Sequence, residues 1–408
     1  DPTSSNIAVA DYAGALREDV KGMIVGVPRD YIDECAPRTD PIVIKLVDRA
    51  IAALKKLGAR IVEVKVPTLN LPTIANAVIY YTEFWAAHKG DAASVLKNGA
   101  GPTVMIRADM DGLPLLENSG LANASTARQV DSDGTEKPVM HACGHDVHIT
   151  ALVGTARQMA ARKANWSGTL VLIAQPAEER IFGARAMVED GLYTRFPKPD
   201  YALAFHVSAD TPTGRIEAPL GIVYSSSDSV DITVHGVGTH GASPHKGVDP
   251  VLVASQIVVS LQSLRSREID PLQGAVVTVG AIHGGIKHNI ISDRVDMQLT
   301  VRSDDVEVRT RLLDGIDRIA RHTALALGVP EDKLPTVTRS AVESTPPTVN
   351  DAATAARVRA ALTAGLGEGV LIDKPRSGMG AEDFAHFVTP ESGVKGVYFS
   401  VGGTPADQ

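Results

Sequence analysis

The stretch Met140-His141-Ala142-Cys143-Gly144-His145-Asp146-Val147-His148 places one cysteine, three histidines and one aspartate within nine residues. A helical pattern of apolar residues begins at Val147 and continues to Met159, so the Cys-Gly-His triplet lies at or just before a helix N-terminus. Glycine lets the backbone turn sharply there, and the helix dipole and nearby imidazoles favour a thiolate at Cys143. This arrangement is suited to holding a metal ion. A free buried cysteine beside surface histidines fits the same stretch, which alone leaves both interpretations open.

Three apolar segments are predicted to be buried strands, and each is followed by carboxylates or by a histidine. They are residues 103–108 before Asp109 and Asp111, residues 169–175 before Glu178 and Glu179, and residues 201–205 before His206. In an open α/β sheet, functional sites collect at the carboxyl ends of the strands. We therefore expect these side chains to converge in one crevice, which favours the metal interpretation of Cys143 and His145.

The expected metal ligands combine sulfur, nitrogen and oxygen donors. They are Cys143, His145, Glu179 and His206. Such a mixed set suits zinc, and also manganese or another divalent ion. Glu178 adjoins Glu179 at a strand end, so the two side chains diverge and Glu178 can face a metal-bound water as its general base. A solvated glutamate pair in a loop is the alternative for these two residues.

Four further polar residues flank this set. Asp109 and Asp111 are candidates to orient the metal ligands by hydrogen bonds, or only to form the turn after their strand. Asp146 is predicted to lie at the helix N-terminus, and His148 is predicted to lie on the surface.

The composition of the 408-residue chain excludes several protein classes. Its net charge is −8 and no basic stripe offsets this charge, which argues against a nucleic-acid-binding protein. No run approaches the roughly 18 apolar residues of a membrane span, and the first residues carry no signal-peptide core. Two cysteines, Cys35 and Cys143, give no disulfide framework. We therefore predict a cytoplasmic protein without a membrane partner, and a processed secreted form stays open.

A second change of composition, near residue 220, begins a segment with its own order of strands and helices. Strands are predicted at residues 229–237, 274–282 and 294–302, and helices at residues 249–267 and 304–327. The first of these helices begins with Asp249 as N-cap and Pro250 at the first helical position. The order β-α-β-β-α predicts a compact sheet with helices on one face. A helix at residues 351–364, capped by Asn350, and a strand at residues 396–401 would return to the first sheet.

The N-terminal part of the chain has a different character. A strand at residues 22–27, a helix at residues 41–57 and an alternating strand at residues 59–66 predict a β-α-β unit. Asp11-Tyr12, the segment Val20 to Pro28, and Leu57-Gly58-Ala59 resemble a stretch of the amidase signature family. Catalysis in that family depends on a lysine and two serines in a Gly/Ser-rich segment upstream, which this chain lacks. The fragment is therefore expected to be structural, and an amidase-signature serine amidase is an alternative that lacks its nucleophile.

Seven motifs in a fixed order mark the rest of the chain. They are Arg107 to Asp111, Met140 to His145, Gln175 to Glu179, Phe205-His206, Thr239 to His245, Lys287 to Ile291, and Gly380 to Phe384. Together they make residues 97–408 similar to the M20 metallopeptidase family, in its amidohydrolase branch. Members of that branch cleave N-acyl amino acids, and they include hippurate hydrolases and indole-acetyl-amino-acid hydrolases.

The resemblance implies an α/β, zinc-peptidase-like catalytic domain with an inserted α+β sandwich as lid. The implied domains are residues 1–92 as the amidase-like fragment, 93–219 with 338–408 as the metal-binding domain, and 220–337 as the lid. The lid usually dimerises, so a homodimer is expected. The same four metal ligands are implied for two divalent ions, zinc or manganese, with Glu178 as the base.

Three lid residues receive roles from the resemblance. His240 would stabilise the oxyanion, including that of a neighbouring subunit's site. Asn289 and Arg302 would bind the substrate carboxylate, and the guanidinium fork of Arg302 suits that group. A turn role for His240 and Asn289, and an exposed strand position for Arg302, are the alternatives.

The predicted function is the hydrolysis of N-acyl amino acids or similar small amides, in which Glu178 deprotonates metal-bound water that attacks the amide carbon. Two departures from the family leave alternatives open. The amidase-like fragment replaces the family's N-terminal helix and strand. No histidine follows His386 in the sequence, and His386 does not match the motif of the family's last metal ligand. An inactive chimeric or truncated metal-binding scaffold is therefore an alternative, as is a thiol hydrolase based on Cys143. The motifs do not set acyl or amino-acid specificity.

Overall fold

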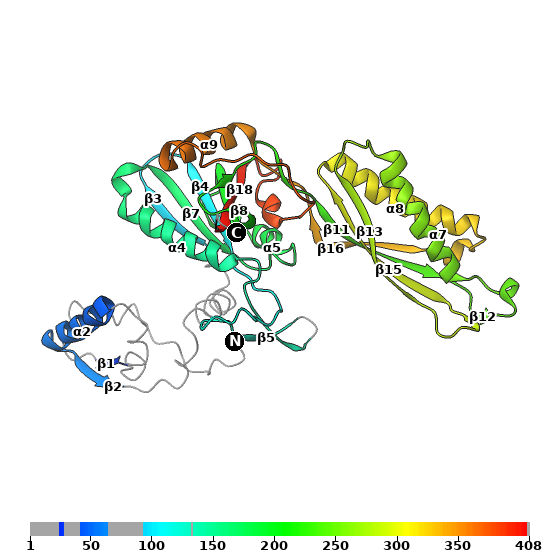
Figure 1. The fold of residues 1–408 in the computed structure, drawn as a ribbon, viewed down its shortest axis with the longest axis horizontal. Coiled ribbons are helices and arrows are strands. Elements are labelled where there is room, and N and C mark those ends of the chain that lie inside the picture. The colour runs from blue at the N-terminus through cyan, green and yellow to red at the C-terminus, as the bar shows by residue number, and fades with distance from the viewer. Residues whose placement is uncertain (1–23, 28–40, 64–92, 132–133, 406–408) are drawn as a thin grey trace. The chain divides into compact units, whose positions relative to one another are not determined.

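The structure is a computed structural model that describes residues 24–27, 41–63, 93–131 and 134–405 (Figure 1). The chain groups into two compact units, one comprising residues 1–87 with 118–127 and the other residues 88–117 with 128–408. Within the described ranges, no helix combines the length and the apolar character that crossing a membrane requires.

The first unit contains a small β-α-β element. β1 (Ile24–Val27) pairs in parallel with β2 (Arg60–Glu63), and α2 (Pro41–Lys56) lies between them in sequence. The helix ends before Gly58, whose left-handed conformation at φ 93° suits a residue without a side chain. The predicted β-α-β unit is confirmed. The end of its predicted second strand, residues 64–66, lies outside the described residues, as does Asp11-Tyr12.

The second unit contains a six-stranded mixed sheet with the order β3-β7-β4-β8-β18-β9. Its strands are β3 (Ala93–Asn98), β4 (Thr103–Asp109), β7 (Gly168–Gln175), β8 (Tyr201–Pro212), β9 (Ile216–Glu217) and β18 (Lys395–Thr404). β4 pairs in parallel with β7 and β8, and β18 pairs in parallel with β8. The carboxyl ends of these four strands therefore lie at one edge of the sheet, as the strand-end argument requires.

Helices pack against this sheet, which confirms the predicted α/β fold class (Figure 1). They are α4 (His145–Ala161), α5 (Gly183–Glu189), α6 (Leu192–Arg195) and α9 (Ala352–Leu366). α4 contacts β4 and β8, α5 contacts β7, and α9 contacts β18. Apolar runs such as residues 170–174 suit strands that are covered on both faces. The core between the layers includes Met105, Ile173 and Phe384, which are fully buried.

Strand β8 is longer than predicted. This strand is predicted to end at Phe205, but β8 continues through His206 to Pro212. It does so because β18 keeps pairing with it, from Ser400 opposite His206 onward. His206 is therefore held by a strand rather than by a loop after one. The predicted return of residues 396–401 to the first sheet is confirmed by the same pairing.

One local prediction near this sheet is wrong. The cap of α9 is Asp351, whose side chain accepts from the first turn, whereas the Asn350 side chain bonds both backbone groups of Tyr398. Between β4 and α4, β5 (Arg128–Val130) and β6 (Glu136–Pro138) form a short antiparallel pair.

A four-stranded antiparallel sheet with the order β13-β15-β11-β16 forms the other part of the second unit. Its elements are β11 (Ser227–His235), α7 (Pro250–Ser263), β13 (Ala275–Gly284), β15 (Arg294–Ser303), α8 (Val306–Ala326) and β16 (Thr336–Thr345). The two helices lie on one face of the sheet, as predicted (Figure 1). The core between them includes Ile232, Ile257 and Leu312.

Aspartates begin both helices of this part. Asp249 accepts hydrogen bonds from the first turn of α7, with Pro250 following it as predicted, and Asp305 does the same for α8. The sequence pattern does not predict β16, because most side chains of this strand are exposed. The predicted boundary between residues 337 and 338 falls inside this strand, and the division into domains stays a prediction. Two short pairs complete the unit, β10 (Ile222–Tyr224) with β17 (Thr348–Val349) and β12 (Thr239–His240) with β14 (Ile290–Ile291).

Candidate metal centre

The loop before α4 holds Cys143 and His145 against β8. Gly144 is the N-cap of α4 and has φ 83°, and a Cβ atom at this position would collide with the Val207 side chain on β8. Glycine is required on both counts, because other residues rarely adopt this conformation and would not fit the space. The loop therefore packs closely against the strand that carries His206.

The structure brings together the four predicted metal ligands and the predicted base. Sγ of Cys143 lies 3.4 Å from Nε2 of His206. Nε2 of His145 lies 3.8 Å from a Glu178 oxygen and 4.0 Å from a Glu179 oxygen. The donor atoms of Cys143, His145 and His206 lie within 4.8 Å of one another, as do those of His145, Glu178 and Glu179. Because His145 belongs to both groups, the five residues form one cluster.

Hydrogen bonds leave one nitrogen of each cluster histidine available for a metal. Nδ1 of His145 donates to the Asp111 carbonyl at 2.9 Å, and Nδ1 of His206 donates to the Val207 carbonyl at 2.6 Å. Carbonyl oxygens only accept hydrogen bonds, so Nδ1 carries the proton in both rings. In the neutral form each Nε2 then keeps its lone pair, and both Nε2 atoms face the cluster.

Two donor atoms of the cluster are buried without a hydrogen-bond partner among the described residues. They are Nε2 of His145 and Oε1 of Glu179. A buried polar atom that lacks a partner costs roughly 1–3 kcal/mol. A bound cation would offset that cost, and a set of sulfur, nitrogen and oxygen donors suits zinc or a similar divalent ion. The residues therefore fit a divalent metal.

The turn that carries the two glutamates has an uncommon backbone. Ala177 has φ 55° and Ile181 has φ 53°, values that residues other than glycine seldom adopt. Conformations of this kind cost about 1–3 kcal/mol and gather at functional sites. The turn follows β7 directly and presents both Glu178 and Glu179 to His145.

Asp111 contacts the cluster on two sides. One of its carboxylate oxygens accepts from the Glu179 backbone N–H at 2.9 Å. The other lies 3.2 Å from Nδ1 of His145. Asp111 can therefore restrict both the imidazole of His145 and the backbone that carries Glu179.

Asp109 and His148 form a buried pair beside the cluster. Asp109 accepts from Arg107 at 2.6 Å, and its other carboxylate oxygen contacts Nδ1 of His148. His148 is only 1% exposed, so its prediction as a surface residue is wrong. It lies three residues after His145 and therefore on the same inward face of α4. Asp146 is exposed in the first turn of α4, as predicted.

Arg107 is the centre of a buried ionic network that the sequence analysis does not identify. Its guanidinium donates to Gln175 at 2.7 Å, to Asp109 at 2.6 Å, to Glu382 at 2.7 Å and to Asp383 at 3.3 Å. All three carboxylate side chains are at most 1% exposed. An arginine inside the apolar strand of residues 103–108 is the sequence signal that could have revealed this network.

The network extends to the predicted base. Glu178, Glu382 and Asp383 place carboxylate oxygens within 4.8 Å of one another. Burial and the charge of Glu382 raise the pKa of Glu178 to about 11, against the opposing charge of Arg107. A cation bound at the cluster would favour the deprotonated carboxylate. The motif Gly380 to Phe384 thus contributes two acidic side chains next to the site.

The three lid residues lie in elements apart from this cluster. His240 in β12 is exposed, and its Nδ1 accepts from the Ala242 N–H at 3.1 Å. The Asn289 side-chain oxygen is buried and has no hydrogen-bond partner among the described residues. β12 pairs with β14, which places His240 near Asn289, and Arg302 donates to the Met379 carbonyl at 3.0 Å. Within the described residues, no hydrogen bond or ion pair joins any of the three to the cluster.

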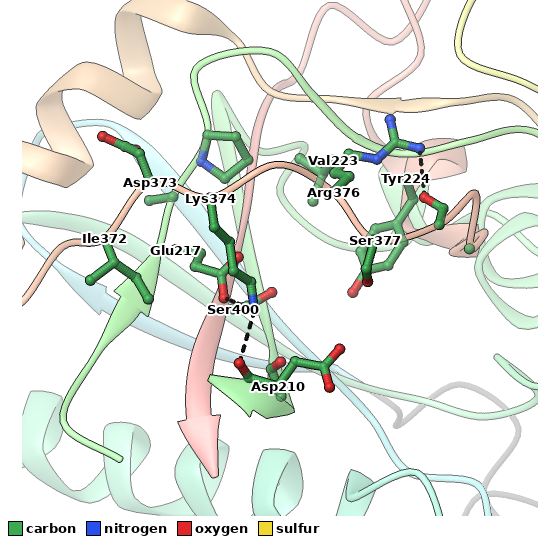
Figure 2. A pocket seen from close by; sticks show the side chains of 15 residues that line it. Asp210, Glu217, Val223, Tyr224, Ile372, Asp373, Lys374, Arg376, Ser377 and Ser400 are labelled. Carbon is green, nitrogen blue, oxygen red and sulfur yellow. Dashed lines mark hydrogen bonds and ion pairs between the residues drawn. The ribbon is translucent and has the colours of Figure 1, made fainter. Parts of the chain in front are cut away.

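A polar cavity of about 320 Å³ lies at the end of β8 (Figure 2). Two of its lining residues lie close to His206 in the sheet, since Ser208 is two residues after it on β8 and Ser400 pairs opposite it. Lys374 points toward the end of the strand, where its Nζ lies 2.9 Å from Glu217 and donates to the Asp210 carbonyl at 3.0 Å (Figure 2). This cation is thus compensated within the cavity wall.

Known proteins are similar to this chain in sequence. The profile of Peptidase family M20/M25/M40 matches residues 105–407. Thermostable carboxypeptidase 2 of Saccharolobus solfataricus is 39% identical over 224 residues, which cover 54% of this chain and 54% of that protein. The chain therefore spans about half the length of that relative. N-acetyl-L-cysteine deacetylase of Bacillus subtilis is 34% identical over 304 residues, covering 74% of this chain and 68% of the deacetylase.

A solved structure has the same architecture. A dinuclear metal-binding peptidase of the M20 family from Bacillus subtilis has a TM-score of 0.62 and 26% sequence identity, covering 81% of this chain and 84% of its own. The family profile covers more than half of the sequence and includes every residue of the cluster. The chain belongs to Peptidase family M20/M25/M40.

Proposed function

We propose that this chain is a metal-dependent amidohydrolase that cleaves the amide bond of N-acyl amino acids. The partly buried cluster that includes Cys143, His145, Glu179 and His206 is the observation that carries the proposal, because it combines metal donors with unpartnered atoms. The similar deacetylase from Bacillus subtilis is named for a substrate of this class.

The metal would be a pair of zinc or manganese ions, and the four proposed ligands would hold it: Cys143, His145, Glu179 and His206. A divalent ion there would supply Lewis-acid chemistry, which polarises the amide carbonyl and makes water more acidic. The chain supplies a rigid donor set: Asp111 and Val207 fix the two histidine rings, and His145 is completely buried. The dinuclear relative supports a pair of ions rather than one.

Glu178 is proposed as the general base. Its carboxylate lies 3.8 Å from His145 and directly precedes the ligand Glu179, so it faces the cluster without being needed as a ligand. It would accept a proton from the attacking water and return that proton to the nitrogen of the leaving amino acid. One residue can serve both proton transfers, because the attacking oxygen and the leaving nitrogen are bonded to the same carbon of the tetrahedral intermediate.

The lid residues are proposed to bind the substrate. His240 would donate a hydrogen bond to the oxygen of the tetrahedral intermediate. Asn289 and Arg302 would bind the carboxylate of the amino acid, because the amide nitrogen of Asn289 and the guanidinium of Arg302 both donate hydrogen bonds. The polar cavity next to His206 would receive a part of the substrate that does not react.

Chelation provides the direct test of this proposal. Removing metal from the purified protein should abolish hydrolysis of N-acetyl-L-cysteine and of hippurate, and adding back zinc or manganese should restore it. The reason is that the cluster would lose its Lewis acid while its protein residues stay in place. Metal content per chain, measured before and after chelation, is the control. Hydrolysis that persists in metal-free protein would contradict the proposal.

We also propose that the chain forms a homodimer through the sheet of β11, β13, β15 and β16. β13 is an edge strand of this sheet, and edge strands offer unpaired backbone groups to another chain. Large apolar side chains are exposed on the adjacent α7, among them Leu252 at 57% and Val259 at 65%.

Light scattering of the purified protein should give twice the mass of one chain, and Val259→Glu should shift the equilibrium toward monomer. Val342→Glu, on β16 at the opposite edge of the sheet, is the matched control and should leave the mass unchanged. A monomer at every concentration would contradict this arrangement.

A further inference from the structure

His148 occupies a place between the Arg107 network and the strand of His206. Its ring is 1% exposed and lies edge-on to the His206 ring, with 4.6 Å between the centroids. Nδ1 contacts the Asp109 carboxylate, and Nε2 accepts from the Val207 N–H at 2.9 Å. Both ring nitrogens are therefore engaged by the protein.

These two contacts determine the tautomer of His148. A backbone N–H can only donate, so Nε2 of His148 must be unprotonated. Nδ1 then carries the proton and donates it to Asp109. With its only lone pair directed at Val207, this imidazole has none left for a metal. His148 is thus separated from the ligand His145, although both project from the same face of α4.

The pairing of β8 explains why the Val207 N–H needs His148 as its acceptor. β4 pairs with β8 only as far as Ala204, so no neighbouring strand continues on that side of β8 at Val207. A buried backbone N–H requires an acceptor, and Nε2 of His148 supplies it. The carbonyl of the same Val207 accepts from Nδ1 of His206 at 2.6 Å and thereby sets the orientation of that ring.

We propose that His148 is a positioning residue that fixes the metal ligand His206 through the backbone of Val207. The linkage runs from Arg107 through Asp109 to His148, and from there to Val207 and the His206 ring. Arg107 anchors the far end, because its guanidinium is buried and bonded on every side. The proposal rests on the metal-ligand role proposed above for His206, and it concerns metal affinity and not the chemical step.

Two substitutions separate the linkage from simple packing. In His148→Asn the amide nitrogen can replace Nδ1 and donate to Asp109, but the side chain is too short to reach Val207. In His148→Gln the amide oxygen can replace Nε2 and accept from Val207. Both variants remove the ring and its edge-on packing against His206, so a difference between them reports the bond to Val207. His322→Gln, at an exposed position of α8, is the control.

The measurement is Zn²⁺ affinity by competition with a chromophoric chelator. His148→Asn should bind Zn²⁺ roughly 10- to 100-fold more weakly than the unmodified protein, as is typical when a partner of a ligand is lost. His148→Gln should recover part of that affinity, and the control should not differ. Folding of each variant is checked by circular dichroism. Unchanged affinity in His148→Asn, or an equal loss in Asn and Gln, would overturn the proposal.

A second measurement needs no variant and covers the case in which one of them fails to fold. Nitrogen-15 NMR of the histidine rings in the full chain should show His148 protonated at Nδ1 and unprotonated at Nε2. A ring protonated at Nε2 would overturn the linkage. If the unmodified protein binds no Zn²⁺, the proposed function fails, while the tautomer still decides whether His148 holds Val207.

Discussion

Glu178→Gln should lower kcat for N-acyl amino acid hydrolysis by roughly 100- to 10,000-fold, the range that a positioned general base contributes. Glutamine keeps the shape of the side chain but cannot accept a proton from water at neutral pH. The bound metal should be retained, because Glu178 adjoins the proposed ligands and is not one of them. Steady-state kinetics and metal content, measured on the same preparation, check both parts of this expectation.

Two further variants distinguish the loss of a general base from the loss of a metal ligand. Glu179→Gln changes the adjacent residue, a proposed ligand, and should lose metal as well as activity. Glu391→Gln changes an exposed glutamate and should leave both unchanged. If Glu178→Gln retained turnover, the base would have to be another group. If it lost metal in parallel with activity, Glu178 would be a ligand and the assignment of the two glutamates would be reversed.

The sequence predicts the cluster because its residues follow apolar strands. Asp109 is the last residue of β4, and Glu178 and Glu179 lie in the turn after β7. Parallel strands bring such positions to one edge of the sheet. His206 illustrates the limit of this argument. The local sequence predicts that its strand ends before it, but the pairing partner of β8 comes from residues 395–404. The length of a strand depends on a neighbour that is remote in sequence, so a local pattern cannot set it.

The Arg107 network escapes prediction for a related reason. Glu382 lies 275 residues from Arg107 along the chain, yet it is bonded to the same guanidinium as Asp109. A polar residue on a helix usually faces solvent, so the sequence predicts a surface position for His148. In α4 the polar residues His145 and His148 face inward, toward the cluster, so the usual relation between polarity and exposure is reversed at the site.

Arg107→Met should lower the free energy of unfolding of the six-stranded part by about 3–5 kcal/mol, the usual cost of leaving buried charges without their partner. Methionine fills much of the space of arginine without its charge. Asp109, Glu382 and Asp383 would then lie in an apolar interior with no cation between them. Urea unfolding followed by circular dichroism measures the change.

Arg318→Met is the matched control for this prediction. Its ion pair with Glu268 has the same N–O distance, 2.6 Å, as the pair of Arg107 with Asp109, but its side chain is 52% exposed. Water screens such a pair, so its loss should cost only about 0–1 kcal/mol. Burial, and not the presence of an ion pair, is then what distinguishes Arg107. Equal effects of the two substitutions would contradict this, and would mean that the carboxylates around Arg107 take up protons and become neutral when the arginine is removed.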